Sequence, residues 1–146
     1  LTGLGKRRAF DAALEECRDL MAAGHAPRIF ILDLDNLKAV NDVSGHAAGD
    51  EAIRLMARAI LERTRAVDQP FRIGGDEFAV IAIEGDGDAI SKRLSEPAPF
   101  QPPTLWMRAS VGWATCGIDA LEPAEAVRLA DRRMYEMKQA RKAACE

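Results

Sequence analysis

The chain has 146 residues, a length that fits one domain with a buried core. Its net charge of −3 and its pI of about 5.5 argue against a protein that binds duplex nucleic acid through a basic surface. The three cysteines are widely spaced and follow no metal-binding pattern, and every apolar run is far shorter than the ~20 residues of a membrane span. With no signal peptide in view, the expected location is the cytoplasm.

The first half of the chain is predicted to contain three helices and one buried strand. The spacing of apolar residues predicts a helix over residues 7–23 that ends at Gly24. The β-branched and aromatic run Arg28–Leu34 predicts a strand covered on both faces. A short helix over residues 36–43 should follow, and then a long helix with Asp50 as its cap. The inner face of that long helix should carry Ile53, Met56, Ala57, Ile60 and Leu61.

The second half is predicted to begin with a β-hairpin over residues 71–83. Gly74 and Gly75 lie between its two apolar runs and should form a tight turn with positive φ. A helix over residues 88–94 and a strand over residues 105–115 should lie on either side of a proline-rich loop. Pro123 starts the last helix, and the whole pattern predicts an α+β domain. The inner face of the last helix should carry Val127, Ala130, Met134 and Met137.

Acidic residues follow two of the predicted strands. Asp33 and Asp35 end the first strand on one face, because side chains alternate along a strand, and Leu34 takes the other face. If this strand pairs with the hairpin, Asp33 lies near Asp76 and Glu77. Carboxylates gathered at one sheet edge repel each other unless cations neutralise them, and oxygen ligands suit Mg²⁺ or Mn²⁺. The simpler alternatives are a solvated turn and acids paired with Lys or Arg.

Several short motifs occur in a fixed order along the chain. They are Leu1-Thr2-Gly3-Leu4, Asp33-Leu34-Asp35-Asn36-Leu37-Lys38-Ala39-Val40-Asn41-Asp42, Gly45-His46 with Gly49-Asp50, Gly74-Gly75-Asp76-Glu77-Phe78, Ser110-Val111-Gly112, and Ala130-Asp131 with Tyr135 and Lys138. Together they resemble the GGDEF family, the diguanylate cyclases of bacteria. The resemblance implies the family's fold, a ferredoxin-like palm of the nucleotidyl-cyclase kind with a mostly antiparallel sheet and flanking helices. It also implies condensation of two GTP into cyclic di-GMP with release of pyrophosphate, each 3′-hydroxyl attacking the α-phosphate of the other GTP.

The resemblance further implies roles for individual residues. The metal ligands would be Asp33, the backbone carbonyl of Leu34, Asp76 and Glu77, and the catalytic residues would be Asp76 and Glu77. Substrate binding would use Asn41 and Asp50 on guanine, His46, the phosphate-binding Lys38, Lys138 and Lys142, and the backbone of Gly74 and Gly75. Arg65 and Asp68 match the family's R-x-x-D inhibitory product site, although a helix-end ion pair is the alternative.

The resemblance also implies a larger assembly. Each domain holds one GTP, so catalysis needs a homodimer, and an N-terminal regulatory domain is expected in the full protein. The chain departs from the family's pattern at several positions: Leu37 and Ser44 replace Phe, and Arg141 and Ala143 replace the Gly and Asn of the ending K-x-x-G-[KR]-N. Two other functions stay open. One is a catalytically silent module that binds GTP or cyclic di-GMP and signals through a partner, and the other is a nucleotidyl cyclase with a different base choice.

Overall fold

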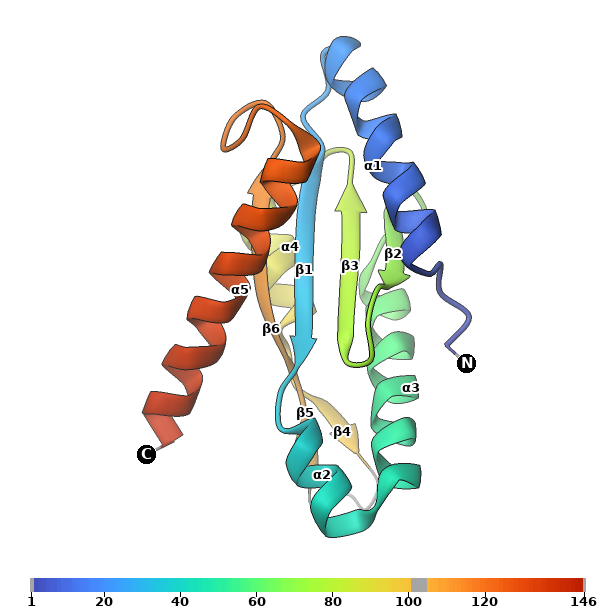
Figure 1. Cartoon of the computed structure of the whole chain (residues 1–146), viewed down its shortest axis with the longest axis vertical. Coiled ribbons are helices and arrows are strands. Elements are labelled where there is room, and N and C mark those ends of the chain that lie inside the picture. Colours follow the sequence, from blue (N-terminus) through green and yellow to red (C-terminus); the bar gives the residue numbers. More distant parts are fainter. Residues whose placement is uncertain (1, 101–104, 146) are drawn as a thin grey trace.

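The structure, a computed structural model, describes residues 2–100 and 105–145 (Figure 1). Leu1 of the opening motif and residues 101–104 of the proline-rich loop lie outside the described residues. The main sheet has four strands in the order β2-β3-β1-β6, and every neighbouring pair is antiparallel. Its strands are β1 (Arg28–Leu34), β2 (Gln69–Arg72), β3 (Glu77–Ala82) and β6 (Ala109–Thr115). This strand order is that of a ferredoxin-like sheet and confirms the predicted α+β class.

Helices cover both faces of the sheet. One face carries α1 (Arg7–Ala22) over the β2 side and α5 (Pro123–Cys145) over the β6 side, while α3 (His46–Arg63) and α4 (Gly87–Leu94) pack behind the sheet (Figure 1). The short helix α2 (Leu37–Ser44) follows the end of β1 and leads into α3. A separate two-stranded sheet consists of β4 (Ala98–Phe100) and β5 (Leu105–Met107).

The sheet separates two apolar cores because successive side chains of β1 point to opposite faces. Phe30 and Leu32 belong to the core beneath α3 and α4, whereas Ile29 and Ile31 belong to the core beneath α1 and α5. Helix α5 approaches β6 at Gly112, where a Cβ atom would overlap the backbone of α5. The close approach of helix and strand therefore explains the glycine of the Ser-Val-Gly motif.

Two predictions about the long helix are wrong. Asp50 is not its cap, because α3 already begins at His46 and Asp50 lies exposed inside it. Gly45 stands at the N-cap with φ +86°, a conformation that suits glycine and lets α2 pass directly into α3. Leu61 was expected on the inner face but is 49% exposed, whereas Ile60 beside it is fully buried.

The hairpin and the strand after it also differ from expectation. Gly74 and Gly75 do not adopt positive φ, because the turn spans the residues between Arg72 and Glu77 and is wider than a two-residue turn. The predicted strand over residues 105–115 is interrupted at Arg108, so that its first part pairs with β4. The strand β4 was not predicted, because the prolines between residues 97 and 103 were taken to exclude regular structure.

Candidate active site

The predicted acidic cluster forms where β1 ends and the β2–β3 hairpin turns. Asp33 lies directly opposite Glu77 in the antiparallel register, and the backbone N–H of Leu34 donates to the carbonyl of Asp76 over 3.0 Å. Cross-strand neighbours in such a pair have Cβ atoms ~5 Å apart. Their side chains share the sheet face that α5 covers. The fold therefore brings Asp33, Asp76 and Glu77 together as the sequence predicted.

The local electrostatics favour protonation of two of these acids. Burial, with a further contribution from the charge of Asp76, raises the pKa of Asp33, although the partner Lys138 opposes the shift. Burial raises the pKa of Glu77 as well, and the carboxylates of Asp131, Asp33 and Asp76 add to the shift. These groups are partly withdrawn from water and close to like charges, so a bound cation would stabilise their ionised forms.

Asp33 provides a test of whether a divalent cation fits here. Its Oδ1 is buried and accepts no aligned hydrogen bond from any residue that the structure describes. The ammonium of Lys138 lies 3.1 Å from this oxygen as an ion-pair partner. Within residues 2–100 and 105–145, no three acidic, His or Cys side chains already converge as a metal cage. The oxygen donors fit a hard cation, which would have to compete with Lys138 for Asp33.

A groove of about 410 Å³ opens beside the acids, between α2 and α5. Its lining includes Asp76 from the hairpin, Lys38 from α2, and Lys138 and Lys142 from α5. Lys138 and Lys142 lie one helical turn apart on the same side of α5. The three lysines predicted for phosphate binding thus line one groove with a predicted metal ligand, an arrangement suited to a polyphosphate.

The residues predicted for guanine recognition lie where α2 meets α3. Asn41 on α2 points at Gly49 on α3, and its side-chain oxygen takes the place that a Cβ of Gly49 would fill. The absence of a side chain at Gly49 therefore lets the Asn41 amide lie against the first turns of α3. Asp50 is exposed in α3, and His46 is exposed as its first residue. An amide and a carboxylate at such a junction can donate to and accept from a purine edge.

Asp35 does not join the acidic cluster. Its Oδ1 accepts a hydrogen bond from the hydroxyl of Ser110 over 2.7 Å, and its Oδ2 accepts one from Arg141 over 2.8 Å. For Asp35 the alternative of a strand-end acid paired with an arginine is thus confirmed. Asp33 is both a strand-end acid paired with a lysine and a member of the acidic cluster, because it contacts Lys138 and lies opposite Glu77.

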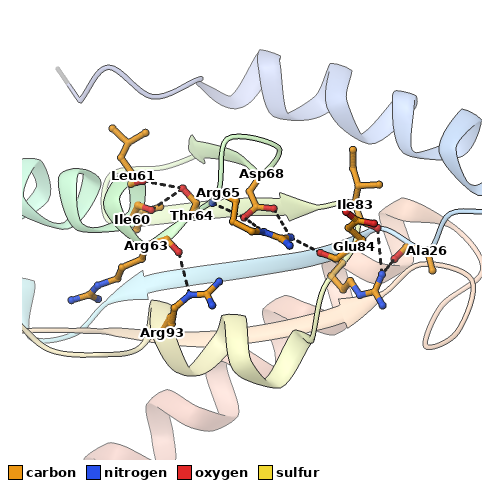
Figure 2. A network of polar contacts seen from close by, with 11 residues as sticks. Ala26, Ile60, Leu61, Arg63, Thr64, Arg65, Asp68, Ile83, Glu84 and Arg93 are labelled. Carbon is orange, nitrogen blue, oxygen red and sulfur yellow. Dashed lines mark hydrogen bonds and ion pairs between the residues drawn. The ribbon is translucent and has the colours of Figure 1, made fainter.

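Arg65 and Asp68 lie at the other end of the hairpin, before β2 begins and beside the end of β3 (Figure 2). The carboxylate of Asp68 accepts from the backbone N–H, Nε and Nη2 of Arg65, over 2.8, 3.2 and 2.9 Å. Arg65 Nη2 also donates to the carbonyl of Glu84. The Asp68 side chain is fully buried, whereas that of Arg65 is 42% exposed. The pair is a closed ion pair with one accessible partner, the guanidinium.

Sequence reasoning missed two arginines next to the site. Arg72 donates from Nε and Nη2 to the carbonyls of Gly74 and Gly75 over 2.8–3.2 Å and so holds the turn that carries Asp76. Its position directly before the turn was a usable signal. Arg141 reaches Asp35 across many residues of sequence, and no local pattern indicates such a contact.

Comparison with known proteins gives one consistent result. The family model described as "Diguanylate cyclase, GGDEF domain" matches residues 1–144. Among curated relatives, the probable diguanylate cyclase DgcJ of Escherichia coli is 32% identical over 95% of this chain, and the diguanylate cyclase DgcS of Shewanella oneidensis is 32% identical over 94%. The cyclic di-GMP phosphodiesterase NbdA of Pseudomonas aeruginosa is also 32% identical over 94% of the chain.

Solved structures agree with this result. The GGDEF domain of YfiN (TpbB) from Pseudomonas aeruginosa has a TM-score of 0.83 and 30% identity over 96% of this chain and 93% of that one. The GGDEF domain of DgcB from Caulobacter crescentus, solved with c-di-GMP, has a TM-score of 0.82 and 25% identity over 95% of this chain and 88% of that one. The chain spans only 29%, 48% and 19% of DgcJ, DgcS and NbdA. Within the described residues, no helix has the length and apolar character needed to cross a membrane.

Proposed function

Because the chain belongs to the GGDEF domain family, we propose that it is a diguanylate cyclase, which condenses two GTP into cyclic di-GMP and releases pyrophosphate. The observation that carries this proposal is the meeting of Asp33, Asp76 and Glu77 beside a groove lined by lysines. One oxygen of Asp33 is buried there, and none of the residues that the structure describes donates an aligned hydrogen bond to it. A cluster of this kind costs stability unless it serves a cationic ligand.

The proposed chemistry assigns each part of the site a separate task. Asp33, the Leu34 carbonyl, Asp76 and Glu77 would hold Mg²⁺ or Mn²⁺, which when bound neutralises the triphosphate and makes the α-phosphorus more electrophilic. Asp76 is the candidate that accepts the proton of the 3′-hydroxyl. Arg72 keeps Asp76 in place by fixing the carbonyls of the glycine turn.

The remaining site residues bind the substrate in this proposal. Lys38, Lys138 and Lys142 contact the phosphates along the groove. No atom of residues 2–100 or 105–145 lies within 4 Å of the position that a Cβ of Gly75 would take, which leaves its backbone open to the nucleotide. Asn41 and Asp50 select guanine, because an amide can donate to O6 and a carboxylate can accept from N1 and N2. His46 lies beside them.

The reaction needs two nucleotides that face each other, so the proposed active unit is a homodimer related by a two-fold axis. A regulatory domain in the full protein would bring the two domains together. The relatives DgcJ and DgcS are longer than this chain, which is consistent with such an arrangement.

Cyclic di-GMP is the proposed ligand of Arg65 and Asp68. The Arg65 side chain is 42% exposed, and its Nη1, which makes no hydrogen bond within the described residues, can donate to guanine O6 or N7. The buried Asp68 would act through Arg65, since Arg65 already occupies both of its oxygens. This contact lies at the opposite end of β2 and β3 from the acidic cluster.

A catalytically silent module is the second candidate function. The observation in its favour is the ion pair between Lys138 and Asp33, which places an ammonium where a cation would bind. A domain of this kind would still bind GTP or cyclic di-GMP and would signal through a partner. The relative NbdA, whose name describes a phosphodiesterase, illustrates that a related segment occurs in a protein named for another activity.

One experiment separates the two functions. Purified protein is incubated with GTP and Mg²⁺, and the nucleotides are separated by chromatography. A cyclase produces cyclic di-GMP and pyrophosphate, and this product is absent from Asp76→Asn. A silent module binds GTP in calorimetry and leaves it unchanged, also when two domains are fused to a dimeric coiled coil. That second outcome rejects the cyclase.

A further inference from the structure

The strand β6 lies at the edge of the main sheet, and within the described part of the chain no other strand pairs with its outer side. Exposed edge strands leave backbone groups without partners and invite pairing with other chains. Here three backbone groups of β6 contact side chains of α5, and this helix runs antiparallel to the strand (Figure 1).

Three residues of α5, spaced four apart, make these contacts. Arg133 Nη1 donates to the carbonyl of Trp113 over 2.9 Å, and the N–H of Val111 donates to Sδ of Met137 over 3.2 Å. Arg141 Nη1 donates to the carbonyl of Ala109 over 2.7 Å. Four helical residues rise ~6 Å and two strand residues ~6.6 Å, so the two repeats match over this distance. The contacts fix both the rotation of α5 and its position along β6.

The contact of Arg141 is the last of the three, and it is more shielded from water than that of Arg133. The same guanidinium is paired with Asp35, whose other oxygen accepts from Ser110 on β6. Arg141 is only 20% exposed and the Asp35 side chain 11%, whereas Arg133 is 42% exposed. Hydrogen bonds between charged groups that are largely shielded from water are stronger than those at the surface.

Arg141 lies between the two lysines of α5 that line the groove. Lys138 precedes it by three residues and Lys142 follows directly, and both line the groove beside Asp76. The helix continues past Arg141 to Cys145, so both lysines project from rigid helix. The orientation of these lysines therefore depends on where the end of α5 is held.

We propose that Arg141 is a positioning residue, which anchors the C-terminal turns of α5 to Asp35 and to the edge of β6 and thereby aims Lys138 and Lys142 at the phosphates of GTP. The inference rests on the proposed function and adds a residue that does not itself touch the substrate. Arg133 makes the same kind of contact with the strand and pairs with Asp119, but it does not line the groove, so it serves as the matched control.

Binding of 3′-deoxy-GTP, which cannot react because it lacks the attacking hydroxyl, tests the proposal in the presence of Mg²⁺. We expect Arg141→Ala to weaken this binding about tenfold, and Arg133→Ala, which removes the same charge and the same kind of backbone contact, to change it less than twofold. Arg141→Lys should recover part of the loss. With GTP itself, KM should rise more than kcat falls, because the lysines bind the phosphates before and during the reaction.

Asp35→Ala separates positioning from simple charge. If Arg141 acted only by its positive charge, loss of the negative Asp35 would tighten nucleotide binding, whereas loss of an anchor weakens it. We therefore expect Asp35→Ala and Arg141→Ala to change affinity in the same direction. Asp35→Asn replaces Asp35→Ala if the latter does not fold. Opposite signs, or an Arg141→Ala affinity equal to that of the wild type, overturn the proposal.

Hydrogen exchange distinguishes failure of this proposal from failure of the proposed function. If the wild type does not bind 3′-deoxy-GTP, the proposed function is wrong, and exchange at the amides of residues 138–144 still decides the role of Arg141. Faster exchange there in Arg141→Ala than in Arg133→Ala supports the anchor. Equal exchange in the two variants rejects it.

Discussion

Both ends of the β2–β3 hairpin carry buried or half-buried carboxylates, but those at one end lie close to like charges and the one at the other end is paired with an arginine. At the glycine turn, Asp33, Asp76 and Glu77 face one another, and burial raises the pKa of Asp33 and of Glu77. At the far end, every oxygen of Asp68 accepts from Arg65. A native fold rarely leaves buried polar atoms without a hydrogen-bond partner, and a functional site is one reason for such an exception. The difference indicates that the acidic end is shaped for a ligand and that the arginine end is stable without one.

The largest expected effect tests the acidic end. Under the proposed function, Asp33→Asn and Asp76→Asn each lower the rate of cyclic di-GMP formation by at least ~10²-fold, because each loses a carboxylate that holds the cation and the reacting groups. Chromatography of the products measures the rate. Near-normal product formation by either variant contradicts the metal assignment. The matched control is Asp42→Asn, whose carboxylate lies on α2 beside the same groove but is not a predicted ligand.

Base selection gives the next largest effect. A carboxylate at Asp50 that faces adenine meets an unprotonated N1 and no 2-amino group, and unpaired polar groups of this kind cost ~1–3 kcal/mol. We therefore expect ATP to bind at least about tenfold more weakly than GTP, and Asp50→Ala to reduce that difference. Since Asp50 is exposed and is not a helix cap, the free energy of unfolding of Asp50→Ala should lie within ~0.5 kcal/mol of that of the wild type. Equal ATP and GTP affinities in the wild type contradict the prediction.

A smaller effect tests whether the arginine end binds product. Arg65→Ala should weaken cyclic di-GMP binding several-fold and remove inhibition that is noncompetitive with GTP, while initial rates without product stay unchanged. Binding is measured by calorimetry and inhibition from initial rates. If inhibition is competitive and persists in Arg65→Ala, the product binds in the guanine pocket instead. If affinity and inhibition are both unchanged, Arg65 and Asp68 are only a helix-end ion pair.

The sequence predicted those parts of the fold that depend on local periodicity and on strand ends. The bounds of β1 and the meeting of Asp33 with Asp76 and Glu77 followed from one apolar run and one hairpin. The start of α3 was missed because Gly45 turns the chain without a polar cap, and a carboxylate inside the first turns resembles a cap in sequence. The Asp35–Arg141 pair was missed because it joins residues far apart in the chain.

The last prediction concerns stability, and the sign of the effect should differ between the two ends. A carboxyl group whose pKa is raised by folding binds its proton more tightly in the folded state. Its stabilising contribution is therefore present below the unfolded-state pKa of ~4 and is lost as the pH rises through the folded-state pKa. For metal-free protein, we expect Asp33→Asn and Glu77→Gln to raise the urea midpoint at pH 7 relative to the wild type, and to have less effect near pH 4.

Asp68→Asn should have the opposite effect, because its fully buried carboxylate accepts three hydrogen bonds from Arg65 in the folded state. Removing the charge weakens bonds that the unfolded chain lacks, so the variant should lose ~1–3 kcal/mol at pH 7. Urea denaturation in the presence of EDTA measures the three variants under one set of conditions. If Asp33→Asn and Asp68→Asn destabilise the protein equally at pH 7, the carboxylates at the glycine turn are as well satisfied as Asp68. The contrast between the two ends then fails, because the acidic end would need no ligand to compensate its charges.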